Sequence, residues 1–122
     1  MIAELLLKLL IILATALLSE DAPAATDSRM CGEVARDADG RISRSQDVLR
    51  QFKMLHPCPS TGIAGGACPS WAIDHVIPLA CGGCDSIENL QWLKDSIKSC
   101  SGAECKDRWE RKIYCRPMKL VD

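Results

Sequence analysis

All eight cysteines of this 122-residue chain lie after residue 30, and their placement constrains the fold more than any other feature. An even number of cysteines in a small exported domain is typical of a disulfide framework. Cross-links of this kind stabilise a domain with a thin core because they restrict the unfolded chain. The short separation of Cys58 and Cys68 favours a local bridge, and Cys31 with Cys115 is a candidate pair for joining the two ends of the domain.

Four of the cysteines also fit a zinc ribbon. Two residues separate Cys81 from Cys84, and after 15 further residues comes a second pair, Cys100 and Cys105, separated by four. Structural zinc sites use cysteine pairs of this kind, although two intervening residues are usual. Because an oxidising compartment favours disulfides, we prefer the disulfide interpretation and keep zinc as the alternative.

The N-terminal segment predicts export. Residues 9–18 carry no charge and follow directly after Lys8, and small residues follow at 22–25. A membrane-spanning helix needs roughly 20 apolar residues, whereas this shorter run suits the core of a secretory signal peptide. We therefore predict a signal peptide over residues 1–25 and a periplasmic or secreted domain over residues 26–122. An uncleaved anchor and a buried core helix are the alternatives.

The charge balance excludes a polybasic nucleic-acid binder. Without the predicted signal peptide the chain has 14 basic and 13 acidic residues. The basic residues are nevertheless concentrated toward the C-terminus, where the segment 94–119 holds eight Lys or Arg and four Asp or Glu. Such a segment can contact phosphates, although a charged stretch is more often the solvated face of a helix.

The pattern of apolar and turn-forming residues predicts an α+β domain. The first expected element is a helix that starts at the capping-box spacing of Ser43 to Gln46 and ends before Pro57. A loop is expected over 57–69. After it we expect a strand over 71–77, a turn through Gly82 and Gly83, a strand over 88–93 and a helix over 103–113.

Three polar side chains flank the predicted turn between the strands: Asp74, His75 and Asn89, the only asparagine of the chain. A carboxylate can hold a hard divalent cation, and an imidazole can take a proton from water near neutral pH. An asparagine amide has a donor and an acceptor, so it can bridge loop backbones or orient the imidazole. A metal, a base and an orienting group are the parts needed to hydrolyse a phosphodiester.

Each of these side chains also has a structural interpretation. His75 in a charged pair is a common structural element, and Asp74 can cap a turn. The other histidine, His56, precedes a proline and is expected to be a loop residue.

The segment DHVIPLACGG at 74–83, followed by NLQ at 89–91, resembles the HNH endonuclease family, whose site is a ββα-metal finger. The resemblance covers about residues 71–112. Upstream, PCPSTG at 57–62 and GACPSWAIDHVIPL at 66–79 are similar to a group of small bacterial HNH proteins. The resemblance implies a small disulfide-rich α+β domain with an HNH-like ββα-metal core that hydrolyses phosphodiester bonds of DNA or RNA.

Residue by residue, the resemblance implies that Asp74 binds the metal, that His75 is the general base, and that Asn89 braces the loop and orients His75. The implied cofactor is a divalent cation, Mg²⁺ or Mn²⁺, with Zn²⁺ or Ni²⁺ as alternatives. Cleavage is expected to be poorly sequence-specific, because phosphate contacts carry no sequence information.

The chain departs from the family pattern at one metal ligand. The family has a second metal-binding His about nine residues after the Asn, where this chain has Lys98, a poor ligand because it is cationic. If residues 95–102 are an insertion, the expected replacement ligand is Glu104, with Asp107 and Asp95 as the next candidates. A non-catalytic exported cysteine-rich binding module with a degenerate HNH fold is the alternative function.

Overall fold

A computed structural model describes residues 2–6 and 27–115 of the chain. The predicted signal peptide, residues 1–25, lies outside the described residues except for the helical stretch 2–6. Within the two described ranges, no helix has the length and hydropathy needed to cross a membrane.

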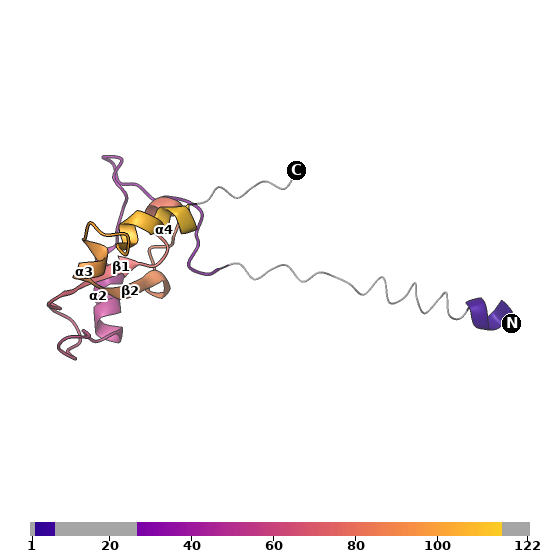
Figure 1. The fold of residues 1–122 in the computed structure, drawn as a ribbon, viewed down its shortest axis with the longest axis horizontal. Coiled ribbons are helices and arrows are strands. Elements are labelled where there is room, and N and C mark those ends of the chain that lie inside the picture. Colours follow the sequence, from indigo (N-terminus) through magenta and orange to yellow (C-terminus); the bar gives the residue numbers. More distant parts are fainter. Residues whose placement is uncertain (1, 7–26, 116–122) are drawn as a thin grey trace.

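The domain is a small α+β structure built on one antiparallel pair of strands. In chain order its elements are α2 (Gln46–Leu55), β1 (Trp71–His75), the 3₁₀ turns η1 (Leu79–Cys81) and η2 (Ile87–Asn89), β2 (Leu90–Lys94), α3 (Asp95–Lys98) and α4 (Lys106–Tyr114). In the view of Figure 1, α4 lies above the two strands and α2 extends below them. The predicted order of helix, strand, loop, strand and helix is confirmed, with α3 as an additional short helix.

Helix α2 begins two residues later than the sequence predicts. The N-cap is Ser45, whose hydroxyl accepts a hydrogen bond from the Val48 N–H. The capping-box start at Ser43 is wrong, because the Ser43 N–H donates to the Ala35 carbonyl at 2.9 Å in the preceding turn structure.

Helix α2 packs on the sheet through Phe52, which is 2% exposed. The Phe52 ring lies 5.6 Å from the ring of Trp92 on β2, centroid to centroid, and 4.7 Å from the ring of His56. The indole N–H of Trp92 donates to the His56 carbonyl at 2.9 Å. His56 thus lies directly after the helix, as the sequence predicts, and its backbone holds the helix end against β2.

Four disulfides join all eight cysteines, in the pairs Cys31–Cys84, Cys58–Cys68, Cys81–Cys115 and Cys100–Cys105. The predicted pair Cys58–Cys68 is confirmed. The predicted pair Cys31–Cys115 is wrong, because each of these cysteines bonds to the connection between β1 and β2 instead. The zinc-ribbon alternative is also wrong, since every sulfur of that set is in a disulfide and none is a thiolate ligand. Disulfides on this scale are consistent with an oxidising extracellular environment.

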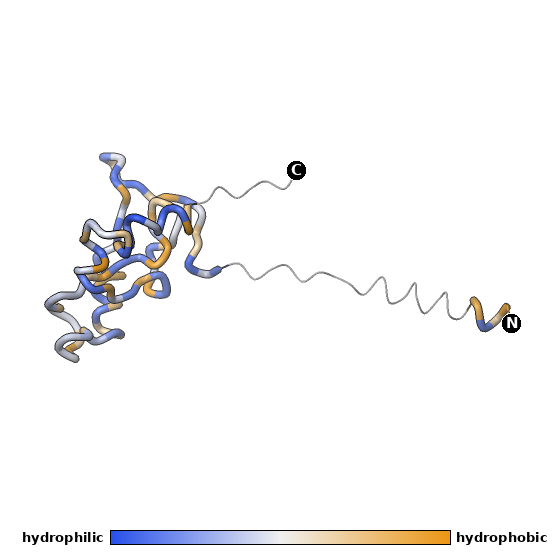
Figure 2. The backbone as a smooth tube through the Cα atoms, viewed as in Figure 1, coloured by the Kyte–Doolittle hydropathy of each residue, from blue (hydrophilic) through white to orange (hydrophobic). Residues whose placement is uncertain are grey.

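The apolar core is small. The buried apolar residues among those described are Phe52, Cys58, Ile77, Leu79, Cys84, Leu90 and Cys105. Three of these seven are disulfide cysteines, so the cross-links are part of the core itself. Figure 2 shows hydrophobic and hydrophilic stretches interspersed along the domain rather than collected in one apolar block. A domain with so little apolar burial depends on cross-links for its stability.

Candidate functional site

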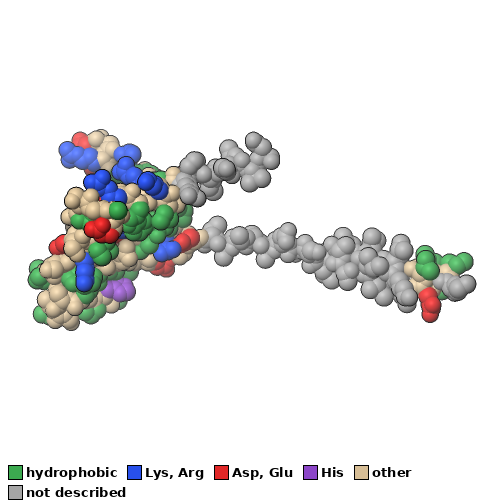
Figure 3. Space-filling view, in the orientation of Figure 1, with side chains coloured by type: hydrophobic (Ala, Val, Ile, Leu, Met, Phe, Trp, Pro, Cys, Tyr) green, Lys and Arg blue, Asp and Glu red, His purple; other side chains and the backbone are tan. Residues whose placement is uncertain are grey.

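A cleft of about 740 Å³ lies beside β1. Asp74 and His75, the last two residues of that strand, both line it. Among its other lining residues, five are basic and one is acidic: Arg44, Arg50, Lys53, Lys98 and Arg111, and Glu110. Figure 3 shows Lys and Arg side chains gathered over α4 and the segment before α2 on the face in view. An excess of positive charge in a cleft attracts anionic ligands, even though the chain as a whole is close to neutral.

The ring of His75 is held by a carboxylate that the sequence analysis did not identify. His75 Nε2 lies 2.9 Å from Asp85 Oδ1, and the His75 side chain is only 12% exposed. The other oxygen of Asp85 accepts the Ser45 N–H at 2.6 Å. An ionised carboxylate only accepts hydrogen bonds, so Nε2 carries the ring proton and Nδ1 is the acceptor of the neutral imidazole. A neutral imidazole in this tautomer has the acceptor nitrogen that a general base needs.

Asn89 is fully buried and braces the connection between the strands. Its Oδ1 accepts the Ile77 N–H at 2.9 Å, and its Nδ2 donates to the carbonyls of Ile77 and Cys84 at 2.9 and 2.8 Å. The bracing geometry expected for Asn89 is therefore present. The expected orienting contact with His75 is not among these hydrogen bonds, because all three go to backbone atoms and the His75 ring is hydrogen-bonded to Asp85.

The two glycines of the predicted turn make this brace possible. Gly82 has φ 88°, in the left-handed region that favours glycine. A Cβ on Gly83 would lie 2.1 Å from the Ile77 carbonyl oxygen and 3.0 Å from Asn89 Nδ2. Only glycine therefore lets the turn approach Asn89 closely enough for the hydrogen bonds to form.

Asp74 is 8% exposed and contacts two lysines. Lys106 Nζ lies 2.6 Å from Asp74 Oδ2, and Lys98 Nζ lies 3.9 Å from Oδ1. Gln91, the residue opposite on β2, donates from Nε2 to Oδ2 at 3.1 Å. Lys106 also donates to the His75 carbonyl at 2.6 Å and to Glu110 Oε2 at 2.8 Å. The carboxylate predicted to bind a metal is thus an ion-pair partner of a lysine.

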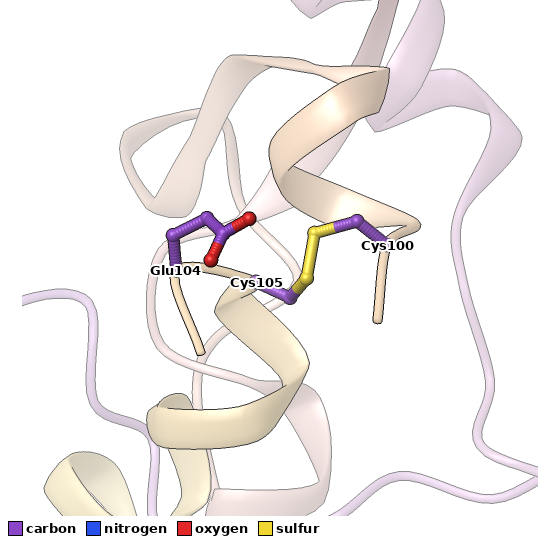
Figure 4. Close-up of side chains that lie close together, drawn as sticks. All are labelled: Cys100, Glu104 and Cys105. Carbon is purple, nitrogen blue, oxygen red and sulfur yellow. A yellow bond between two sulfur atoms is a disulfide. The ribbon is translucent and has the colours of Figure 1, made fainter. Parts of the chain in front are cut away.

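Glu104, the predicted second metal ligand, lies elsewhere. It is exposed and is not among the residues that line the cleft with Asp74. Its carboxylate lies beside the Cys100–Cys105 disulfide (Figure 4), and the ligand atoms of these three residues lie within 4.8 Å of one another. Because the two sulfurs are bonded to each other, this group offers one carboxylate and no thiolate, which is too few donors for a metal site.

Glu110 is the acidic residue of α4 that reaches the cleft. The sequence of residues 106–112, KDRWERK, holds a signal for it, since Lys106 and Glu110 are spaced i,i+4 and so lie on one helix face. Asp85 had a weaker signal: it is the first carboxylate after the predicted Gly82-Gly83 turn.

The donors around Asp74 do not fit a divalent cation. Mg²⁺ and Mn²⁺ need several oxygen ligands, whereas the two carboxylates here, Asp74 and Glu110, share the ammonium of Lys106. A lysine ammonium has three donors and no lone pair to offer a metal. Among the described residues, the one group of three potential ligands is the Cys100, Glu104 and Cys105 group. The described residues around Asp74 therefore do not form a site for a divalent cation.

Comparisons of the chain with models of protein families, with curated proteins and with solved structures find no match. The HNH resemblance therefore rests on the residues quoted from the sequence and stays a prediction.

Proposed function

We propose that this protein hydrolyses phosphodiester bonds of nucleic acids in the cleft beside β1. In this proposal β1, the connection to β2, β2 and the following helices form an HNH-like ββα core. The Asp74-His75 pair at the strand end and the buried Asn89 brace support it. Export to the periplasm or the medium, which the disulfide framework fits, is part of the same proposal.

The observation that carries the proposal is the 2.9 Å contact between Asp85 and His75, because His75 itself lines a cleft with five basic side chains. Water in the cleft gives a proton to His75 Nδ1 and attacks phosphorus. The bond between phosphorus and the leaving oxygen breaks, and the leaving oxygen takes a proton from solvent. Asp85 stabilises the imidazolium that forms, because its carboxylate accepts from Nε2.

The charge of the cleft favours a polyanion over a single small phosphate. Three of the basic residues come from α2 or the segment just before it, namely Arg44, Arg50 and Lys53, whereas Arg111 belongs to α4. Basic side chains on two different elements can contact successive phosphates of one strand. Because phosphate contacts carry no base information, we expect weak sequence preference on either DNA or RNA.

A non-catalytic binding module is the second candidate, and one observation favours it. Asp74 is ion-paired with Lys106 and hydrogen-bonded to Gln91, and Glu110 is ion-paired with the same lysine, so neither carboxylate of the described cleft lining is free to bind a cofactor. Such a module would bind nucleic acid in the same basic cleft and leave it intact.

A cleavage assay separates the two candidates. The disulfide-intact protein is incubated with supercoiled plasmid and, separately, with a labelled single-stranded RNA, beside the variants His75→Ala and His56→Ala. His56 is the matched control because it is the only other histidine and holds β2 through its backbone carbonyl, which alanine keeps. We expect cleavage by the wild type and by His56→Ala, and a loss of about 100-fold or more in His75→Ala. Equal cleavage by all three proteins, or binding without cleavage, would contradict the proposal.

A further inference from the structure

Building on the proposed function, we propose that cleavage at this site needs no divalent cation. The ammonium of Lys106 fills the cation position beside Asp74, and Lys98 supplies positive charge to the substrate phosphate.

Lys106 is built into the site rather than resting on it. Its side chain is 4% exposed, and its ammonium contacts Asp74 Oδ2 at 2.6 Å, Glu110 Oε2 at 2.8 Å and the His75 carbonyl at 2.6 Å. The contact with Asp74 is an ion pair, and the contacts with Glu110 and the His75 carbonyl are hydrogen bonds. A divalent cation bound to Asp74 would remove one of these partners and place its own charge next to a buried ammonium. Both effects oppose binding of the cation.

The charges of the cluster balance without a metal. Asp74 and Glu110 contribute two negative charges, and Lys106 and Lys98 contribute two positive charges within 3.9 Å of those carboxylates. Lys106 also bonds to the backbone carbonyl of His75, so it fixes the end of β1 from which the base projects. We therefore assign Lys106 as a positioning residue. Its ammonium holds Asp74, Glu110 and the end of β1 together, as a bound cation would.

Lys98 is the lysine that can contact substrate. It lines the cleft, and its side chain is 36% exposed. Its ammonium donates to the Ile73 carbonyl at 2.6 Å, whereas the 3.9 Å distance to Asp74 Oδ1 is too long for a hydrogen bond. Donors of Lys98 therefore remain for a phosphate oxygen. An ammonium fixed beside the phosphate stabilises the negative charge that increases on its oxygens as water attacks.

The first test is cleavage in the presence of a chelator. Wild type, Lys98→Met and Lys94→Met are assayed on plasmid DNA and on RNA, in excess EDTA and in Mg²⁺ or Mn²⁺. Lys94 is the matched control, because this lysine ends β2 only four residues before Lys98, whereas its ammonium lies over the Trp71 ring and it is not among the residues that line the cleft. We expect wild type and Lys94→Met to cleave equally well with and without metal, and Lys98→Met to be about 100-fold slower.

Different results of this assay would contradict the present inference and the proposed function. Cleavage that requires added metal, or a Lys98→Met variant as active as wild type, overturns the present inference and leaves the proposed function intact. Cleavage under neither condition overturns the proposed function.

The second test does not depend on activity. Mn²⁺ is titrated into wild type, Asp74→Asn and Lys106→Met, and the free ion is followed by electron paramagnetic resonance. We expect no saturable Mn²⁺ site in wild type, and a new one in Lys106→Met, where the two carboxylates lose their ammonium. A saturable site in wild type that Asp74→Asn removes overturns the inference. This comparison of wild type with Asp74→Asn decides the question even if Lys106→Met does not fold.

Discussion

Asp85, in the connection between β1 and β2, lies with its Oδ1 2.9 Å from His75 Nε2. Its second carboxylate oxygen accepts the backbone N–H of Ser45 at 2.6 Å, at the start of α2. One carboxylate therefore links the ring of the proposed base, at the end of β1, to the start of α2, which is distant in sequence. The disulfide at the neighbouring residue, Cys84–Cys31, further restricts the position of Asp85.

Asp85→Asn tests whether the carboxylate sets the protonated nitrogen of His75. The amide oxygen can still accept the Ser45 N–H, so the start of α2 should be little changed. The amide NH₂ would then face Nε2, which places the ring proton on Nδ1 and removes the proposed base. We expect about a 100-fold loss of cleavage, with a free energy of unfolding within about 1 kcal/mol of the wild-type value. Full activity in a folded Asp85→Asn protein would show that Asp85 does not orient the base.

Asn89→Asp tests the brace separately from the chemistry. The aspartate keeps an oxygen that can accept the Ile77 N–H. Its second oxygen replaces the NH₂ group that donates to the carbonyls of Ile77 and Cys84, so these two carbonyls lose their donor. We expect a loss of stability on the order of 3 kcal/mol, because buried carbonyls lose their partner and meet a negative charge. Denaturant unfolding measures this loss, and Asn89→Ala should also destabilise the fold. A change below about 0.5 kcal/mol would contradict the bracing role.

The disulfides should contribute unequally to stability. Cys31–Cys84 closes a separation of 53 residues and Cys100–Cys105 one of five. If a cross-link acts mainly on the unfolded chain, replacing both cysteines by serine should cost about 4 kcal/mol for the first pair and about 2 kcal/mol for the second. Urea unfolding of the two double variants measures the difference. Peptide mapping under non-reducing conditions checks the pairing itself, and a bridge between Cys31 and Cys115 would contradict the structure.

Binding to nucleic acid should depend on salt through the basic cleft. Replacing Arg44 and Arg111 by glutamine removes two of its positive charges, and Lys94→Gln serves as the control outside the lining. We expect the slope of log affinity against log salt to fall by about 1 to 2 for the double variant on duplex DNA, and to stay unchanged for the control. Fluorescence anisotropy at several salt concentrations measures both slopes. Equal slopes for all proteins would place the binding surface elsewhere.

Local signals in the sequence predicted local structure well. The loop between Cys58 and Cys68, the Gly82-Gly83 turn and the two strands are present because short-range turn chemistry and β propensity determine them. The ends of elements were less predictable, since competing hydrogen bonds decide them. The Ser43 N–H donates a hydrogen bond to the Ala35 carbonyl, and Ser45 is the N-cap of the helix instead.

The features that the sequence did not determine all depend on contacts between distant residues. The partners of Cys31 and Cys115 depend on which segments meet in space, and spacing alone does not encode that. The expectation of Glu104 depends on an insertion at residues 95–102, but α4 begins only at Lys106 and turns Glu110 toward the cleft. The pairing of Asp74 with Lys106 is likewise a tertiary contact, across 32 positions of sequence.

Chemical rescue of the proposed base is the most direct test of the central claim. Single-turnover cleavage of an end-labelled oligonucleotide is measured for wild type and for His75→Gly, each with and without added imidazole. If His75 takes a proton from water, His75→Gly should be slower by about 100-fold or more, and free imidazole should restore part of the rate in that variant alone. Cleavage by His75→Gly at the wild-type rate, or no cleavage by the wild type, would contradict the account.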